Sequence, residues 1–382
     1  MVTINNEQLD QKIRDIQNRL QIIGLSAGII YKEQLVWEGY YGLANINQKK
    51  YVHAQTVYRI ASISKSILAT ALMQQYEKGK FNLNDDISDH LGFKVRNPYF
   101  PNTPITFTQL MTHTSSLQDE YVEFAIASYD SHPPSLKEIL LPGGKFYKKQ
   151  IWGKYEPGDS GHFTYSNLAS IVVGTLVEIL SGERFDLYCK KHIFEPLEMR
   201  ETSFNIEDIT LSELAVLYEY DPENEEFAIA LDSADRDRPK KIDLSHYMPG
   251  KNGGIYNPQG GVKSTVRDLS KFLMLHMNAG VYLDKQILKP ETVELMHQPF
   301  WQGTPKDSVY RKKGIHFQIT EDLVEGKTVI GHSGNAYGLI SGLYFNKVDE
   351  LGIVFLTNGS KIEIGKLFYT IEEELASALY PV

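Results

Sequence analysis

Cysteine is almost absent from this sequence. The 382 residues include one cysteine, Cys189, so no intramolecular disulfide can form and a zinc site made of several thiolates is excluded. The 11 histidines show no His-Glu-x-x-His or comparable spacing, the pattern that brings two histidines to one helix face around a metal ion. The sequence therefore predicts no metal site.

Basic charge and long apolar runs are also scarce. The chain has 39 lysines and arginines against 48 aspartates and glutamates, a formal net charge of -9. An acidic chain is poorly suited to bind a phosphate backbone, so nucleic acid is not an expected partner. The longest apolar stretch near the N-terminus, residues 20–31, is interrupted by polar residues and is shorter than the roughly 20 residues that span a bilayer. We therefore expect no transmembrane segment.

The N-terminus also lacks the pattern of a secretory signal. Residues 1–6 contain no basic segment followed by an apolar core. The chain as it stands is expected to be cytoplasmic, and it would be periplasmic or extracellular if a signal peptide had been removed. The single cysteine does not distinguish these locations, because cytosolic and periplasmic proteins both tolerate one buried thiol.

The composition that remains is that of an ordinary globular protein, with 42% hydrophobic and 23% charged residues. Helical periodicity covers residues 6–20, 62–78, 166–180, 266–277 and 361–379, and strand-like runs cover residues 25–31, 35–42, 315–320, 328–332, 339–345 and 352–357. Residues 219–258 are polar and predict a long surface excursion. Because strands occupy both ends of the chain, we predict one α/β domain from residues 1–60 and 260–382, with residues 61–259 inserted as a mostly helical domain.

A Ser-x-x-Lys tetrad begins the second predicted helix. Ser62 and Lys65 lie three residues apart and therefore share one helix face. A serine hydroxyl is a weak nucleophile until a neighbouring base takes its proton, and a lysine that burial has deprived of water can act as that base. About one or two such tetrads are expected by chance in a chain of this length at average residue usage, so the tetrad alone is a weak signal.

Two further short motifs follow in the sequence. Tyr165 and Asn167 lie at the start of another predicted helix, where a phenol could relay a proton and an amide could hold both a lysine and a substrate. The alternative is an ordinary tyrosine and a helix cap. His332-Ser333-Gly334 ends a predicted strand and precedes Asn335, whose amide could contribute to an oxyanion hole with that of Ser62. The alternative there is a turn between strands.

The three motifs in this order resemble those of the penicillin-binding proteins and serine β-lactamases. Their surroundings are also similar to that family: YRIASISK (58–65), ITFTQLMTHTSSL (105–117), FTYSNLASIVVG (163–174), IFEPLEMRETSF (193–204), GGVKST (260–265) and GHSG (331–334). Together they extend over nearly the whole chain. The resemblance implies the β-lactamase/transpeptidase-like fold, an antiparallel sheet flanked by helices with an inserted mostly helical domain.

The resemblance also implies an acyl-transfer mechanism without a metal or organic cofactor. Ser62 would attack a carbonyl carbon to form an acyl-enzyme, and Lys65 would take its proton. Tyr165 would pass that proton to the leaving group, while Asn167 would orient Lys65 and the substrate. The backbone amides of Ser62 and Asn335 would bind the oxyanion, and water would then hydrolyse the ester.

One departure from the family pattern bears on the substrate. β-Lactamases usually have Lys-Thr-Gly where this chain has His332-Ser333-Gly334. A lysine there is a fixed cation for a substrate carboxylate, whereas a histidine is largely neutral at pH 7. The sequence looks more like the esterase, D-aminopeptidase, D-amino-acid amidase and DD-peptidase branches. The Tyr-x-Asn form is of the class C type, and the Glu-x-x-Leu-Asn loop of class A is missing.

The leading hypothesis is therefore a serine hydrolase of a small ester or amide, with D-amino-acid derivatives and peptides among the candidate substrates. A DD-carboxypeptidase or weak β-lactamase is the alternative within enzymes. A penicillin-binding-like module that is acylated without turnover is the alternative of another class. The sequence leaves the oligomeric state open.

Overall fold

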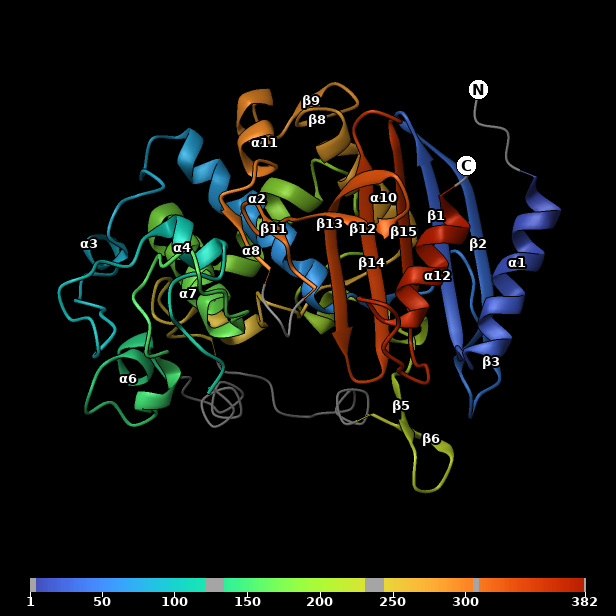
Figure 1. Cartoon of the computed structure of the whole chain (residues 1–382), viewed down its shortest axis with the longest axis horizontal. Coiled ribbons are helices and arrows are strands. Elements are labelled where there is room, and N and C mark those ends of the chain that lie inside the picture. Colours follow the sequence, from blue (N-terminus) through green and yellow to red (C-terminus); the bar gives the residue numbers. More distant parts are fainter. Residues whose placement is uncertain (1–4, 121–133, 231–243, 305–308, 381–382) are drawn as a thin grey trace.

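Strands from both ends of the chain form one large sheet in the computed structural model (Figure 1). The structure describes residues 5–120, 134–230, 244–304 and 309–380. Within these ranges the sheet has the order β10-β11-β12-β13-β14-β15-β1-β2-β3, and its neighbouring strands are antiparallel. The strands are β1 (Gly24–Tyr31), β2 (Gln34–Asn45), β3 (Lys50–Tyr51), β10 (Trp301–Gln302), β11 (Lys312–Lys313), β12 (Gln318–Val324), β13 (Lys327–Ala336), β14 (Leu339–Asn346) and β15 (Leu351–Thr357). The predicted antiparallel sheet is confirmed.

The sheet has a hydrophobic core on each face, because successive side chains of a strand point to opposite sides. On β15, Val354 and Leu356 belong to the core that contains α2 (Ser64–Glu77) and α10 (Val266–Met277). Ile353 and Phe355, which alternate with them, belong to the core under α1 (Asn6–Arg19) and α12 (Thr370–Leu379). Figure 1 shows α12 crossing one face of the sheet while α10 lies behind it.

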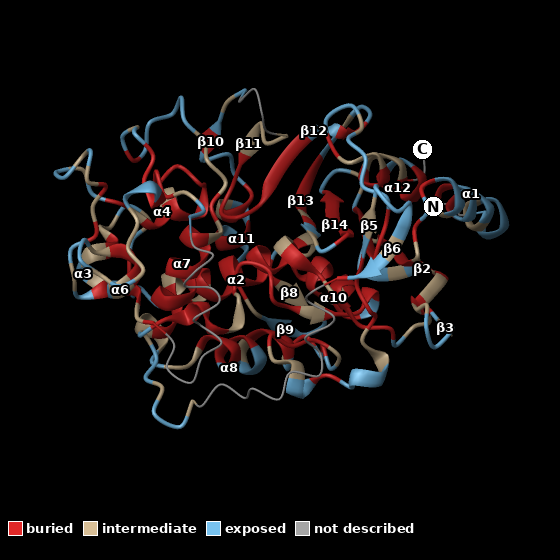
Figure 2. Cartoon of the chain, turned by 90° about the horizontal axis from the view of Figure 1, so that it is seen from below, coloured by how far each residue is buried: buried red, intermediate tan, exposed pale blue. Residues whose placement is uncertain are grey.

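The remaining helices gather beside the sheet, around α2. They are α3 (Ile87–Leu91), α4 (Phe107–Met111), α6 (Leu136–Leu140), α7 (Asn167–Ser181), α8 (Phe185–Cys189) and α11 (Pro290–Met296), with a π-helical turn η3 (Lys190–Phe194) and 3₁₀ turns that include η1 (Ala61–Ile63) and η7 (Gly253–Tyr256). Figure 2 shows α2 and α7 almost entirely buried. A helix that is buried on most sides needs apolar residues all round, and both helices have them. The assignment of residues 61–259 to a separate domain stays a prediction.

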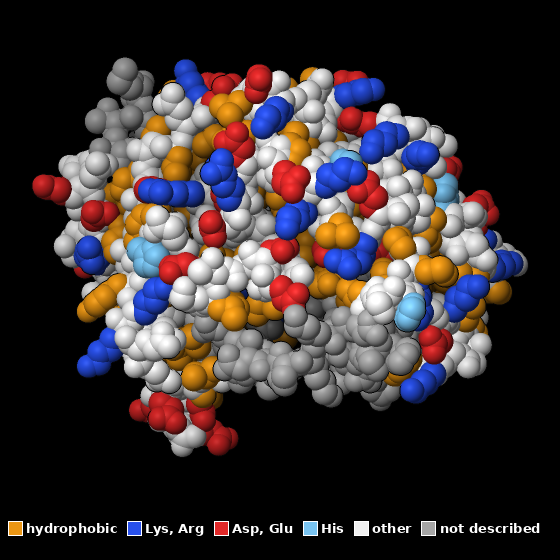
Figure 3. All heavy atoms as spheres, turned by 180° about the vertical axis from the view of Figure 1, so that it is seen from behind, with side chains coloured by type: hydrophobic (Ala, Val, Ile, Leu, Met, Phe, Trp, Pro, Cys, Tyr) orange, Lys and Arg blue, Asp and Glu red, His pale blue; other side chains and the backbone are white. Residues whose placement is uncertain are grey.

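Two short hairpins lie outside the large sheet, β5 (Tyr218–Asp221) with β6 (Glu226–Ile229) and β8 (Val281–Tyr282) with β9 (Lys285–Gln286). The first lies in the segment predicted as a surface excursion, of which residues 231–243 are outside the described ranges. Its tip is exposed at Glu223 and Glu225, and acidic side chains mark it at the lower left of Figure 3. Elsewhere on that face acidic and basic side chains are interspersed. No helix in the described ranges is both long and apolar enough to cross a membrane.

Several predicted bounds are wrong. The strand expected at residues 315–320 is β12 (Gln318–Val324), because His316 takes a left-handed φ of 56° that ends strand geometry there. The helix expected from residue 361 begins at Thr370, because the carboxylate of Glu373 accepts hydrogen bonds from the backbone amides of residues 366–368 and holds them in a loop. The strand expected to end at His332 continues as β13 to Ala336, paired with Leu339.

Candidate active site

Ser62 lies in the short 3₁₀ turn η1, directly before α2. The sequence predicted it in the first turn of the α-helix itself, which is wrong by two residues because α2 begins at Ser64. The preceding residue, Ala61, has a φ of 45°, a left-handed conformation that costs free energy for any residue with a β-carbon. The turn is held from within by Ser64, whose hydroxyl donates to the Ala61 carbonyl at 2.7 Å. It is held from outside by Ile60, whose amide donates to the Val262 carbonyl at 3.0 Å.

Strand β13 lies directly against this turn, and Gly334 makes the approach possible. A β-carbon on Gly334 would come within 2.4 Å of the Ile60 carbonyl oxygen and 3.1 Å of the Ala61 β-carbon. No side chain fits at that distance, so glycine is required for the strand to pack beside Ser62. The hydroxyl of Ser341, on β14, donates to the same Ile60 carbonyl at 3.0 Å. The Ser-x-x-Lys motif and the His-Ser-Gly motif are therefore adjacent in space.

Lys65 joins the first two motifs. Its side chain is fully buried, and its Nζ lies 3.1 Å from Ser62 Oγ, 2.7 Å from Asn167 Oδ1 and 2.7 Å from the Gln259 carbonyl oxygen. The amine also lies 4.8 Å from the centre of the Tyr165 ring. Ser62 and Lys65 share one face of the helix start, as predicted, and Asn167 at the first residue of α7 reaches the same amine.

Burial changes the proton affinity of Lys65. Removal from water disfavours the ammonium form and lowers the pKa of Lys65 to about 7, although the negative charge of Asp119 opposes this by raising it. A lysine with that pKa is about half deprotonated at neutral pH, whereas an exposed lysine is almost fully protonated there. The amine beside Ser62 can therefore accept a proton near pH 7.

Tyr165 lies beside the amine within a group of aromatic rings. Its ring stacks on that of Tyr310 with the centroids 5.5 Å apart, and the ring of His113 lies 4.4 Å away. His113 also accepts a hydrogen bond on Nδ1 from the Ser166 amide at 3.1 Å, which ties the start of α7 to the histidine. Burial, with a smaller effect from Tyr165, raises the pKa of Tyr310 well above its usual value. The proton-relay role of Tyr165 stays a prediction.

His332 points into the protein and is neutral. It is completely buried, and its Nδ1 lies 2.6 Å from the Ser333 carbonyl oxygen, an acceptor that requires the proton on Nδ1. Burial, followed by the nearby Lys313, lowers the pKa of His332 well below its usual value. Ser333 is half-buried, and Asn335 is exposed with its side-chain amide donating to the Tyr369 hydroxyl. The oxyanion-hole role of the Ser62 and Asn335 amides stays a prediction.

Sequence reasoning missed two residues of this site. Gln259 gives Lys65 a backbone carbonyl, and it directly precedes the GGVKST segment that resembles the family. Asp119 binds the start of α7 and lies two residues after ITFTQLMTHTSSL. Proximity to these two segments is the signal that could have drawn attention to both residues. No group of three or more His, Cys, Asp and Glu side chains in the described part of the chain could hold a metal ion.

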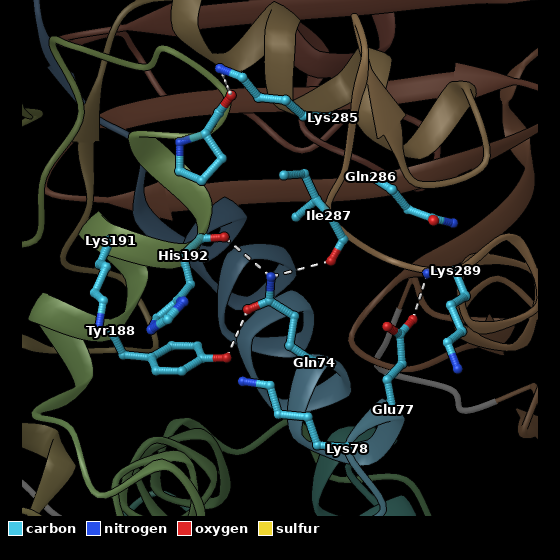
Figure 4. A pocket seen from close by; sticks show the side chains of 11 residues that line it. Gln74, Glu77, Lys78, Tyr188, Lys191, His192, Lys285, Gln286, Ile287 and Lys289 are labelled. Carbon is cyan, nitrogen blue, oxygen red and sulfur yellow. Dashed lines mark hydrogen bonds between the residues drawn. The ribbon is translucent and has the colours of Figure 1, made fainter.

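A cavity of about 610 Å³ lies near the opposite end of α2, and none of the predicted site residues lines it (Figure 4). Gln74 is nine residues after Lys65, which is about 14 Å along a helix. Its side-chain amide donates to the His192 and Ile287 carbonyls, and Glu77 accepts the Lys289 amide at 2.6 Å. Lys285 donates to the Pro196 carbonyl at 3.1 Å. The contacts of Gln74 and Glu77 attach α2 to its neighbours.

Comparisons with known proteins agree on one family. A family model described as Beta-lactamase matches residues 9–366. Penicillin-binding protein 4* of Bacillus subtilis is 25% identical over 235 residues, which are 61% of this chain and 47% of that protein. Beta-lactamase-like protein 2 of Dictyostelium discoideum is 24% identical over 362 residues, 91% of this chain and 58% of that protein. The chain thus spans about half the length of these curated relatives.

A solved structure supports the fold independently. D-amino acid amidase from Ochrobactrum anthropi, in complex with L-phenylalanine amide, superposes with a TM-score of 0.73 at 20% identity, over 98% of this chain and 97% of that one. At this identity the likeness establishes the shared fold and leaves the substrate open.

Proposed function

Because this chain belongs to the β-lactamase family of serine hydrolases, we propose that it hydrolyses small esters or amides through an acyl-enzyme on Ser62. Ser62 Oγ forms a bond to the substrate carbonyl carbon, and its proton passes to Lys65 Nζ. The carbon–leaving-group bond then breaks, with Tyr165 passing the proton to the departing alcohol or amine. Water attacks the ester and releases the acid, which restores Ser62.

The contacts of Lys65 carry this proposal. A neutral amine has two N–H donors and one lone pair. Asn167 Oδ1 and the Gln259 carbonyl, each 2.7 Å from Nζ, accept the two N–H groups. The lone pair is then left for the group at the third contact, Ser62 Oγ at 3.1 Å. Once the proton has moved, all three N–H bonds of the ammonium have acceptors, so the same contacts suit the base before and after transfer.

The environment of His332 bears on the substrate class. A buried, neutral imidazole offers no fixed cation to a substrate carboxylate. This favours substrates whose reacting end carries no carboxylate, such as small esters and amides. The structurally similar D-amino acid amidase was solved with an amino-acid amide, which makes D-amino-acid amides a first class to try. A β-lactamase substrate carries a carboxylate that this site would bind weakly, and a DD-carboxypeptidase or weak β-lactamase is the alternative.

A substrate panel with matched serine variants tests the proposal. Wild-type protein, Ser62→Ala and Ser66→Ala are compared on p-nitrophenyl esters, D-alanyl anilides and nitrocefin. Ser66 is the control because it is buried one turn further along α2. We expect ester or anilide turnover by the wild type and Ser66→Ala, and a loss of about 10³-fold or more in Ser62→Ala. Equal turnover by wild type and Ser62→Ala would exclude the mechanism.

Mass spectrometry of the intact protein separates the alternatives. A hydrolase gives a Ser62 acyl adduct that disappears as substrate is consumed. An adduct that forms and persists would identify a module that is acylated without turnover. Turnover confined to nitrocefin, or a stable penicilloyl adduct, would favour the hypothesis of a β-lactamase or DD-carboxypeptidase over that of a hydrolase of small esters or amides.

A further inference from the structure

Asp119 occupies the N-terminus of α7 and binds four groups there. Its Oδ1 accepts hydrogen bonds from the Asn167 amide at 2.7 Å, the Leu168 amide at 3.0 Å and the Ser166 hydroxyl at 3.2 Å. Its Oδ2 accepts the side-chain Nδ2 of Asn167 at 2.8 Å. The carboxylate therefore holds both the backbone and the side chain of the residue that contacts Lys65.

This contact fixes which way the Asn167 amide faces. A carboxylate has lone pairs only, so it must receive the Nδ2 donor of Asn167. The other end of the amide, Oδ1, is then directed at Lys65, 2.7 Å away. Without the carboxylate the two ends could exchange, since the oxygen and nitrogen of an asparagine amide are nearly equal in size.

The orientation matters because of the lone pair on Lys65. An exchanged amide would present N–H to the amine, and a neutral amine would accept it with its lone pair. That lone pair would no longer be available to the proton of Ser62. We propose that Asp119 is a positioning residue: it fixes the Asn167 amide so that the lone pair of Lys65 is directed at Ser62. The inference rests on the proposed function and adds a residue to it.

Asp119 also acts on Lys65 through its charge. Burial lowers the pKa of Lys65 to about 7, and the Asp119 carboxylate raises it against that trend. Removing the charge should lower the pKa of Lys65 further. The acid limb, the low-pH part of the kcat/KM profile where activity rises with pH, should therefore move to lower pH. This shift follows from the charge of Asp119 at its position, so the positioning role itself is tested by the fall in kcat and by its recovery in a double variant. The other titratable groups near Lys65 are Tyr165 and the buried set His113, Lys313, His316 and His332.

The first test is Asp119→Asn, which keeps the shape and removes the charge. The side-chain amides at positions 119 and 167 would then both point N–H groups at each other, which favours a turned Asn167 amide with its N–H toward Lys65. We expect kcat to fall by about 10- to 100-fold, the size that misdirected catalytic groups produce, with little change in KM. The acid limb of kcat/KM should move below that of the wild type. An unchanged limb with an unchanged kcat would overturn the inference.

A double variant makes the test sharper. In Asp119→Asn/Asn167→Asp the two side chains are exchanged. The carboxylate at position 167 must then present an acceptor oxygen to Lys65, and the amide at position 119 donates a hydrogen bond to that carboxylate. We expect kcat to recover at least in part, while the acid limb moves above that of the wild type because the negative charge is now nearer Lys65. A double variant no more active than Asp119→Asn at any pH would favour mere helix capping and contradict the inference.

Asp221 supplies the matched control. Its carboxylate makes the same kind of contacts in the β5–β6 hairpin, accepting the Glu223 amide at 2.9 Å and the Asn224 side-chain Nδ2 at 2.7 Å. Asp221→Asn should leave kcat and the acid limb unchanged. If the wild type shows no Ser62-dependent turnover, the proposed function fails. If it does, and Asp119→Asn behaves like Asp221→Asn, only the positioning role fails.

Discussion

Lys65 and Lys313 are both completely buried, yet their surroundings differ in almost every other respect. Lys65 has two carbonyl-type oxygens and a hydroxyl around its amine. Lys313, on β11, has no hydrogen-bond partner for its amine among the described residues, and the amine lies over the ring of Tyr310 at 4.6 Å. Burial lowers the pKa of both lysines, to about 7 for Lys65 and well below its usual value for Lys313.

The difference separates a buried lysine whose amine has hydrogen-bond acceptors from one whose amine has none among the described residues. An ammonium needs acceptors for its N–H bonds, and the interior provides them only around Lys65. The groups near Lys313 are themselves basic. After burial, the Lys313 charge is the second-largest cause of the lowered pKa of His113, His316 and His332. Lys313 and these three histidines form a buried basic cluster, and the rings of His113 and His332 lie 4.4 Å and 6.3 Å from the ring of Tyr165. We therefore expect a lysine to act as a base only where burial is combined with acceptors for its N–H groups.

The largest expected effect comes from removing the Lys65 amine, with removal of the Lys313 amine as the comparison. Lys65→Met should lower kcat/KM by about 10³-fold, within the usual range for loss of a general base. Lys313→Met should leave kcat/KM within about threefold, because its amine has no hydrogen-bond partner among the described residues with which it could exchange a proton. Steady-state assays on the best substrate of the panel measure both. Equal losses in the two variants would remove the distinction between the lysines.

Removing one hydrogen-bond acceptor from the Lys65 amine should make its surroundings more like those of Lys313. In Asn167→Leu the amine keeps the Gln259 carbonyl and Ser62 but loses the 2.7 Å contact to Oδ1. The ammonium that forms on proton transfer is then one acceptor short, so we expect kcat to fall by about 10- to 100-fold. Single-turnover acylation followed by mass spectrometry measures the step directly. Acylation at the wild-type rate would mean that Asn167 has no part in it.

The pH profile should report the proton on Lys65. The amine must be neutral to accept the Ser62 proton, so kcat/KM should rise with pH and level off above the pKa of about 7. Below that value the rate should fall about tenfold per pH unit. In Lys313→Met the limb should stay in place, because burial and the Asp119 charge, and not Lys313, shift the pKa of Lys65. A limb near pH 10 would show that Lys65 titrates as an exposed lysine.

The sequence predicted most of the elements that carry this site. The period of apolar residues placed α10 at its observed bounds and α7 within one residue at each end. It placed β12 and α12 poorly, because the turn at His316 and the loop held by Glu373 arise from contacts that no local pattern encodes. Periodicity reports which face of an element is buried, and it is weakest where a segment is fixed by a single distant side chain.

The site itself was predictable only where a motif existed. Ser62, Lys65 and Asn167 belong to short motifs and meet in the structure. Gln259 contributes a backbone carbonyl, which any residue has, so its identity carried no signal. Lys313 follows two other basic residues, Arg311 and Lys312, in a stretch that resembles an exposed strand. Its burial beside the Tyr310 ring is a result of the fold, which the local sequence does not display.

The smallest expected effect is on stability, and it has a definite sign. Because burial lowers the pKa of Lys313, the unfolded chain binds the proton more tightly than the folded chain, and folding loses free energy at neutral pH. Methionine has a similar length and no charge, so Lys313→Met should stabilise the fold by about 1 kcal/mol, the usual size of a stabilising substitution. The gain should shrink as the pH approaches 10.5, where the unfolded lysine also loses its proton. Urea unfolding at pH 7 and pH 10 measures this, with the neighbouring Lys312→Met as control. Lys312 is about one-third exposed and pairs with Glu321 at 2.8 Å, so its loss should change stability by less than about 0.5 kcal/mol. A destabilised Lys313→Met would mean that the amine is charged and bound by an acceptor, and the two buried lysines would then be alike.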